Sequence, residues 1–233
     1  MNPYVYLHEI VNTVPGREEA YTASVLSVRF DPTRRKPGRK VHGALTQLRT
    51  AETSGQSPLA VNIWENTWEG LTGALKRQFQ DVERDVNMEE WWNRNLHLRR
   101  GGYDRVLVPT AWSPTASELR EREVRCEVVL HEVAWLPLGE PERYLGEFEQ
   151  RLVPAAARHG LEVIGAFRVA MRPGQVLTVL GAPEWGHLAR FMEDGNADLA
   201  AWRRYRDSIV KRSEEMVMLP VRHDKLAGRT GFR

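Results

Sequence analysis

The stretch Leu7-His8-Glu9-Ile10 recurs as Leu130-His131-Glu132-Val133, an offset of 123 residues, and this repetition decides the fold. Further matches follow in the same order along the chain. They pair Tyr21 with Tyr144, Pro32 with Pro154, Gly38 with Gly160, Gly43 with Gly165, Trp68-Glu69-Gly70-Leu71 with Trp185-Gly186-His187-Leu188, and Trp92 with Trp202. Ordered matches at a slowly falling offset indicate two tandem copies of a unit of roughly 110 residues.

The two copies meet at a polar segment. Residues 113–122, SPTASELRER, contain a proline and few apolar side chains, which is typical of a linker. We therefore expect a first unit at 1–112, a linker at 113–122, a second unit at 123–222 and a tail at 223–233. The tail has Gly, Lys and Arg but little to bury, so we expect it to be loosely held.

Each copy has the same order of expected elements. Residues 5–11 and 128–135 are rich in β-branched and aromatic side chains, which favours a strand. A helix follows in the first copy, because Tyr21, Val25 and Val28 recur at helical spacing. Second strands are expected from Gly43 and Gly165, third strands at 59–64 and 176–180, second helices from about Thr67 and Glu184, and final strands ending at Pro109 and Pro220. The order β-α-β-β-α-β is that of a ferredoxin-like unit.

The order of elements also predicts how the copies pack. A ferredoxin-like unit places both helices on one sheet face and leaves the other face bare. Two copies in one chain can cover each other, sheet against sheet. The predicted fold is therefore α+β, with two tandem ferredoxin-like units whose facing antiparallel sheets form an intrachain α+β barrel.

The composition narrows the class of protein. Of 233 residues, 42% are hydrophobic and 27% charged, which is ordinary for a globular chain. Thirty-three Lys and Arg against 31 Asp and Glu leave a charge of +2, so nucleic acid is not an expected partner. No apolar run is long enough for a membrane span, and the N-terminus lacks a signal-peptide pattern. The single Cys126 allows no internal disulfide, so a cytoplasmic location is expected.

Several short motifs resemble those of one known group of proteins. They are Pro15-Gly16 after the first strand, Asn62-Ile63-Trp64-Glu65 in the third, Glu90-Trp91-Trp92 and Ala201-Trp202 in the second helices, and the closing Val106-Leu107-Val108-Pro109. With these motifs, each copy resembles the NIPSNAP-like branch of the dimeric α+β barrel superfamily. That superfamily includes cofactor-free monooxygenases, polyketide cyclases, haem-degrading enzymes and proteins of no known activity. The resemblance therefore implies a fold but no particular reaction.

The resemblance indicates which residues of the first strand face the barrel interior. Neighbouring strand residues point to opposite faces, so His8 and Glu9 cannot both face inward. In relatives, the residue seven before the turn glycine tends to face inward. Counting back from Gly16 gives Glu9, whose copy is Glu132. We therefore expect these two carboxylates to be catalytic acid and base groups, because burial and a second carboxylate raise a carboxyl pKa.

Two other interpretations remain open for these strands. Each glutamate could instead be held by a tyrosine or an arginine, for which Arg49 and Arg168 are candidates. If the phase is wrong by one residue, His8 and His131 line the interior, as bases, as metal ligands or as hydrogen-bonded core histidines. Both pairs therefore remain catalytic candidates.

The substrate-binding candidates are strand neighbours of the glutamates. Leu7 and Leu130 share the face of Glu9 and Glu132. The resemblance places Trp64 inward, and Asn62 then lies on the same face. Their expected counterparts in the second copy are Val179 and Gly181. Because Gly181 stands where the first copy has Trp64, we expect a cavity with more room on one side than on the other. Trp64 could also be an ordinary core residue. The remaining helical tryptophans, Trp68, Trp91, Trp92, Trp185 and Trp202, are expected to pack in the core.

No cofactor or metal is expected. Haem-degrading relatives use a histidine about ten residues after the inward tryptophan, and that position holds Ala74 here and Phe191 in the second copy, with His187 four residues early. A glycine-rich phosphate loop, an H-E-x-x-H motif and a G-x-S-x-G motif are all missing from the sequence.

Two functions fit these features. The first is a cofactor-independent enzyme of secondary metabolism that acts by acid/base chemistry on a small, largely apolar, aromatic or polyketide-like molecule. The reaction would be a cyclisation, isomerisation, elimination or cofactor-free oxygenation. The alternative is a non-catalytic, NIPSNAP-like ligand-binding or assembly protein whose barrel is filled by Trp64, Phe167 and Met171. A small molecule is the expected partner in the first case, no membrane is expected, and homo-oligomerisation is left open.

Overall fold

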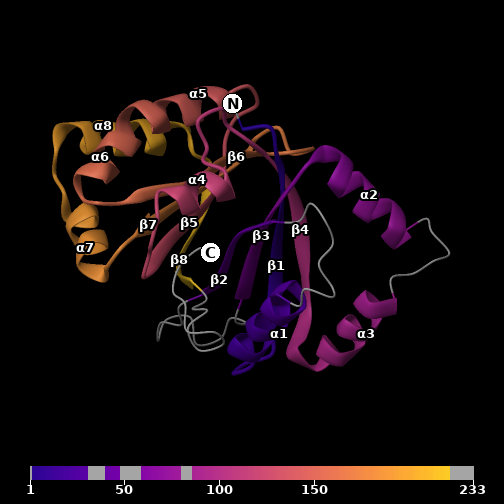
Figure 1. Ribbon diagram of the computed structural model, residues 1–233. Helices are drawn as coiled ribbons and strands as arrows, with labels where there is room; N and C mark the ends of the chain where they lie inside the picture. The colour runs from indigo at the N-terminus through magenta and orange to yellow at the C-terminus, as the bar shows by residue number, and fades with distance from the viewer. Residues whose placement is uncertain (1, 31–39, 48–58, 80–85, 221–233) are drawn as a thin grey trace.

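The computed structural model describes residues 2–30, 40–47, 59–79 and 86–220, in which two units follow one another (Figure 1). The first unit consists of β1 (Val5–Thr13), α1 (Glu18–Phe30), β2 (Lys40–Gln47), β3 (Leu59–Asn66), α2 (Trp68–Phe79), α3 (Val86–Asn95), η2 (Leu96–Leu98) and β4 (Arg99–Pro109). The second consists of β5 (Val128–Trp135), α5 (Pro141–Glu147), η3 (Phe148–Leu152), α6 (Val153–Arg158), β6 (Glu162–Val169), β7 (Gln175–Ala182), α7 (Trp185–Glu193), α8 (Ala197–Ile209) and β8 (Arg212–Pro220).

The predicted order of elements is confirmed, with one refinement. The second helix of each copy is two helices, α2 with α3 and α7 with α8. A short helix, α4 (Ala116–Glu121), lies in the segment expected to be a linker, and Thr115 caps it in a capping box with Glu118. The expected tail at 223–233 lies outside the described residues, as does Arg49.

The strands form a closed barrel, as expected from two facing sheets. The strand order around the barrel, within the described residues, is β1-β3-β2-β8-β5-β7-β6-β4. Each unit therefore contributes four neighbouring strands, and the pairs β2–β8 and β4–β6 join the units. All pairings are antiparallel. Closing the sheet in this way leaves no free strand edge in the barrel.

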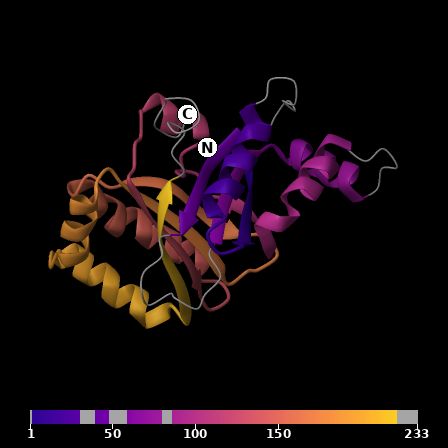
Figure 2. The same ribbon diagram turned by 90° about the horizontal axis from the view of Figure 1, so that it is seen from below.

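The helices lie outside the barrel, in two groups on opposite sides (Figures 1 and 2). The first unit's α1, α2 and α3 form one group, and α5 to α8 of the second unit form the other. No helix among the described residues is long and apolar enough to cross a membrane.

The barrel interior is filled largely by apolar side chains. Its largest side chains are less than 2% exposed and come from both units: Tyr6, Ile63, Leu107, Phe167, Leu177 and Met218. Separate apolar clusters lie between the barrel and each helix group. The helical tryptophans divide between core and surface, because Trp202 is buried, whereas Trp68 and Trp185 are 52% and 43% exposed. The expectation that all of them pack in the core is therefore wrong.

Candidate functional site

The histidines, and not the glutamates, point into the barrel. His8 shares its strand face with Tyr6 and Ile10, which belong to the interior core, and His131 shares its face with Val129 and Val133. The prediction that Glu9 and Glu132 face inward is therefore wrong by one residue, and the alternative phase is the observed one.

The count from the turn glycine does not hold for this chain. The pairing of β1 with β4 shifts between Asn12 and Thr13, where Arg100 of β4 has no partner in the register, so the bulge lies on β4. β1 itself alternates regularly from Tyr6 to Ile10, and the seventh residue before Gly16 lies on its outer face.

Inside the barrel, the two histidines contact each other. The Nε2 atoms of His8 and His131 are 2.9 Å apart, and the rings stack with centroids 5.0 Å apart. Burial lowers the pKa of both imidazoles, and the positive charge of Arg105 lowers both further. Two neutral imidazoles can form this hydrogen bond only if one donates its Nε2 proton and the other accepts it.

Glu9 lies on the outer face of the first sheet, beneath the helices of the first unit. Its Oε2 atom accepts hydrogen bonds from Trp64 Nε1 at 2.6 Å and from Asn62 Nδ2 at 3.2 Å. The three residues predicted to act together are thus together, although outside the barrel. Both Glu9 and Trp64 are half-buried.

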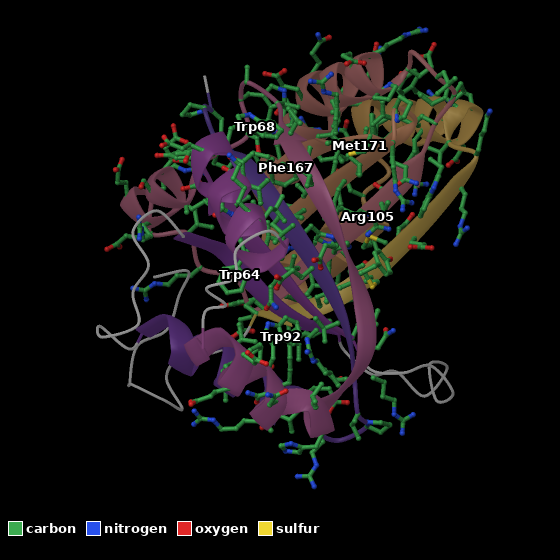
Figure 3. The ribbon with its side chains drawn as sticks, turned by 90° about the vertical axis from the view of Figure 1, so that its right-hand side faces the viewer. Trp64, Trp68, Trp92, Arg105, Phe167 and Met171 are labelled. Carbon is green, nitrogen blue, oxygen red and sulfur yellow. The ribbon has the colours of Figure 1, made fainter. Side chains whose placement is uncertain are left out.

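Two further side chains complete the surroundings of Glu9. Burial raises the pKa of Tyr21 and the negative charge of Glu9 raises it further, while the nearby Arg99 opposes the rise. Arg99 itself stacks on the Trp92 ring, with its guanidinium carbon 3.1 Å from the ring centroid. Trp64 and Trp92 both lie on the helix side of the sheet (Figure 3).

Glu132 occupies the equivalent place in the second unit, but an ion pair holds it. Arg206 donates to Glu132 Oε1 from Nη2 at 2.6 Å and from Nε at 3.0 Å. Tyr144 and Thr178 lie 3.4 and 3.5 Å from the other carboxylate oxygen. Burial raises the pKa of Glu132, and Arg206 acts against that rise. The interpretation in which a glutamate is held by an arginine and a tyrosine is therefore observed here.

The arginine that holds Glu132 is not the expected one. Arg168 is on the surface and pairs with Glu142 at 2.5 Å. Arg206 follows Trp202 by one helical turn on α8, which was the available signal in the sequence. Sequence reasoning likewise missed Arg105, which shares the inward face of β4 with Leu107.

The expected counterparts on the third strands are also displaced by one residue. Glu9 pairs with Asn62 and Glu132 with Thr178, so Thr178 and Leu180 correspond to Asn62 and Trp64. Leu7 and Leu130 lie on the helix-facing side with the glutamates, whereas Val179 and Gly181 face the barrel interior.

The room left by Gly181 is already filled. A Cβ atom on Gly181 would lie 2.1 Å from the Sγ atom of Cys126. The predicted lopsided opening at this glycine is therefore wrong, because the Cys126 thiol fills it. Burial raises the pKa of that thiol to about 12, so it is not a nucleophile at neutral pH.

The described residues offer few sites for a metal ion. They contain no group of three or more His, Cys, Asp or Glu side chains that could hold one. Ala74 belongs to α2, and its side chain lies outside the described part. Phe191 is buried in the core of the second unit and contacts the His159 ring.

Comparison with solved structures establishes the fold. A protein from Fusobacterium nucleatum named "putative monooxygenase" matches with a TM-score of 0.63 and 6% identity, over 94% of this chain and 93% of that chain. The chain therefore has the same α+β barrel fold as this protein. A protein of the same name from Lactobacillus acidophilus matches with a TM-score of 0.62 and 9% identity, over 95% of each chain.

Other solved structures also match this chain. An anthrone oxidase-like protein matches with a TM-score of 0.57 and 8% identity, over 94% of this chain and 92% of that chain. NIPSNAP proteins are also among the matches, each over 40% of this chain. The sequence itself matches no family model and no curated protein. At these sequence identities the similarity shows the fold alone, so any chemistry has to be inferred from the residues of this chain.

Proposed function

We propose that the chain is a cofactor-independent enzyme that transfers a proton to or from a small, largely apolar molecule at Glu9. The observation that carries this proposal is the half-buried Glu9 carboxylate, which the indole N–H of Trp64 holds at 2.6 Å. A half-buried carboxylate that is fixed in this way is a candidate for a general base. Its counterpart Glu132 is held by Arg206 instead, so the two units differ in chemistry.

The neighbours of Glu9 suit an aromatic substrate with a carbonyl or phenol group. The Trp64 and Trp92 rings offer flat apolar surfaces, which are typical of pockets for such ligands. The Oδ1 atom of Asn62 is buried and has no hydrogen-bond partner among the described residues, so it can accept a hydrogen bond from a substrate hydroxyl. Arg99, on the same side, can stabilise negative charge that develops on a substrate oxygen.

Of the four reaction types expected from the sequence, we propose cofactor-free oxygenation. Its support is the names of the barrel proteins of similar fold, two "putative monooxygenase" proteins and one that is anthrone oxidase-like. Glu9 would remove a proton from an activated C–H group, and the resulting carbanion would reduce O2. With an anthrone as the substrate, one oxygen atom becomes the new carbonyl oxygen of the quinone product, and the other leaves as water.

The direct test is to supply the purified chain with anthrone and O2 and to measure the reaction. Oxygen uptake and quinone absorbance are followed for the wild type, Glu9→Gln and the matched control Glu132→Gln. We expect Glu9→Gln to lower the rate by about 10²–10⁴-fold, while Glu132→Gln keeps most of it. If the wild-type rate equals the rate in buffer alone, the chain does not oxygenate anthrone. If the rate of Glu9→Gln equals the wild-type rate, Glu9 is not the general base.

The packed interior favours a second candidate, a ligand-binding protein without chemistry. Phe167 does fill the barrel, as that alternative expected, whereas Trp64 lies outside it and Met171 is 99% exposed. If this candidate is right, we expect an apolar aromatic ligand to quench the tryptophan fluorescence saturably. Trp64→Phe should reduce that quenching, and no product should form. Product formation that depends on Glu9 excludes it.

A further inference from the structure

Arg105 is a buried cation inside the barrel. Its side chain enters from β4 and the residue is 5% exposed. Nη2 donates to the Tyr103 hydroxyl at 3.1 Å, and the guanidinium lies 4.7 Å from the Tyr103 ring centroid. The Nε and Nη1 atoms have no hydrogen-bond partner among the described residues. Burying a charge with unsatisfied donors is costly unless an opposite charge compensates it.

The histidine pair lies next to this cation. Arg105 is directly opposite His8 in the pairing of β1 with β4, and both side chains face inward. The Nδ1 atoms of His8 and His131 are buried and have no hydrogen-bond partner among the described residues. The ring that accepts at Nε2 carries its only proton on Nδ1, and the ring that donates from Nε2 has an unprotonated Nδ1. The interior therefore holds at least three unsatisfied N–H donors in one neighbourhood.

The carboxylates that face the interior are engaged elsewhere. Glu65 lies toward the end of the barrel where α4 begins, and it accepts hydrogen bonds from the Tyr6 hydroxyl at 2.9 Å and from Ala116 N at 2.7 Å. Glu214 lies toward the other end and pairs with Arg212 at 2.5 Å. Within the part of the chain that the structure describes, Arg105 forms no ion pair with either carboxylate.

We propose that the barrel interior binds a compact monovalent anion, such as a halide or a small carboxylate, between Arg105 and the pair His8–His131. The anion compensates the positive charge of Arg105 and accepts hydrogen bonds from the unsatisfied N–H groups. The site is separate from Glu9, which lies on the outer face of the sheet, and Figure 3 shows Arg105 on the opposite side of the strands from Trp64. The proposal therefore stands without the proposed enzymatic function.

Anion binding and protonation are coupled in such a site. A bound anion favours the charged imidazolium, so it raises the affinity of the pair for a proton, and a proton raises the affinity for the anion by the same factor. Because both imidazole pKa values are lowered in the folded barrel, binding should strengthen as the pH falls from 7 to 5. The side chains opposite the pair in the strand register are Ile63 from β3, Arg105 from β4, Val179 from β7 and Met216 from β8. The titratable or charged groups farther along the described part of the barrel are Tyr6, Glu65, Tyr103, Arg212 and Glu214.

The test uses the full chain with sodium chloride and sodium formate in separate titrations, at an ionic strength held constant with sodium gluconate, whose anion is too bulky for the site. We expect a saturable rise in Tm of about 3–6 °C at roughly ten times Kd. In ¹⁵N spectra of the seven histidines, the ring signals of His8 and His131 should shift with the same midpoint. Response to chloride alone or to formate alone identifies the class of anion.

Variants separate this site from general salt effects. Arg105→Met should abolish the rise in Tm and should fold without loss of stability in gluconate, because it removes an uncompensated buried charge. Arg100→Met, an exposed arginine of the same strand, should behave as the wild type. The proposal is overturned if neither anion gives a saturable response in the wild type, if the response survives in Arg105→Met, or if the shifted signals belong to other histidines. The wild-type spectra decide the question even if Arg105→Met does not fold.

Discussion

The Nε2 atom of His8 lies 2.9 Å from the Nε2 atom of His131, and the two residues are 123 positions apart, which is the offset of the repeat. Each residue therefore meets its own copy. In a twofold arrangement, only residues beside the axis can contact their own equivalents. A contact between residues at this offset is what a twofold relation between the two units predicts.

The first prediction concerns pH and this histidine pair. The pKa of His131 falls to about 4 in the folded barrel and that of His8 is also lowered, whereas unfolded histidines titrate near 6.5. Between these values the unfolded chain binds more protons, so the free energy of unfolding decreases as the pH falls below about 6.5. We expect a loss of about 2 kcal/mol at pH 5 for His131, measured by urea denaturation at pH 7 and pH 5.

A double substitution isolates the contribution of the pair from that of the carboxylates. His8→Gln with His131→Gln should reduce the difference in unfolding free energy between pH 7 and pH 5. An equal pH dependence in this variant and in the wild type would contradict the prediction.

The second prediction concerns the ion pair on the outer face of the second unit. Arg206→Met leaves Glu132 buried without its cation, which should cost about 3–5 kcal/mol in unfolding free energy. Combining it with Glu132→Gln should recover most of that loss, because the uncompensated charge is gone. Arg168→Met is the matched control, since it breaks an exposed pair worth no more than about 1 kcal/mol. Additive effects of the two substitutions would show that Glu132 and Arg206 are not coupled.

The third prediction concerns packing at Gly181. Gly181→Ala places a Cβ atom 2.1 Å from Cys126 Sγ and 3.1 Å from Ile164 Cδ1. We expect a loss of about 1–3 kcal/mol from overpacking. Gly181→Ala with Cys126→Ala should be more stable than Gly181→Ala alone, because the sulfur atom is removed. Thermal and urea unfolding of the single and double variants measure this, and a double variant no better than the single one would refute the assignment.

The fourth prediction concerns the attachment of the α4 helix to the barrel. Tyr6→Phe removes a hydrogen bond to the buried Glu65 carboxylate, which also accepts from the first backbone N–H of α4. The expected loss is about 1–3 kcal/mol, because a buried carboxylate oxygen loses a donor. Tyr205→Phe is the control, since the Tyr205 hydroxyl is buried without a hydrogen-bond partner among the described residues. Equal losses in the two variants would mean that the hydroxyl of Tyr6 adds nothing.

The order of elements and the pairing of the units were readable from the sequence. The expected strand at 128–135 coincides with β5, and the final strands end at Pro109 and Pro220 as predicted. These features depend on local alternation, on turn residues and on a repeat, all of which are written in consecutive residues. The grouping of Glu9 with Asn62 and Trp64 was also predicted, because residues on one strand face stay together whichever way that face points.

The direction of that face and the partners of the buried charges were decided by the tertiary structure alone. The face of β1 that points inward follows from its pairing with β3 and β4 and from the closure of the barrel, which no single segment specifies. Arg206 reaches Glu132 across 74 residues because α8 packs on the second sheet. Arg105 and the two histidines come together because the barrel closes around them. The partner of a buried charge and the direction of a strand face depend on segments that are far apart in the chain. The local sequence therefore determined the helices and strands of this protein, and their packing determined which residues meet.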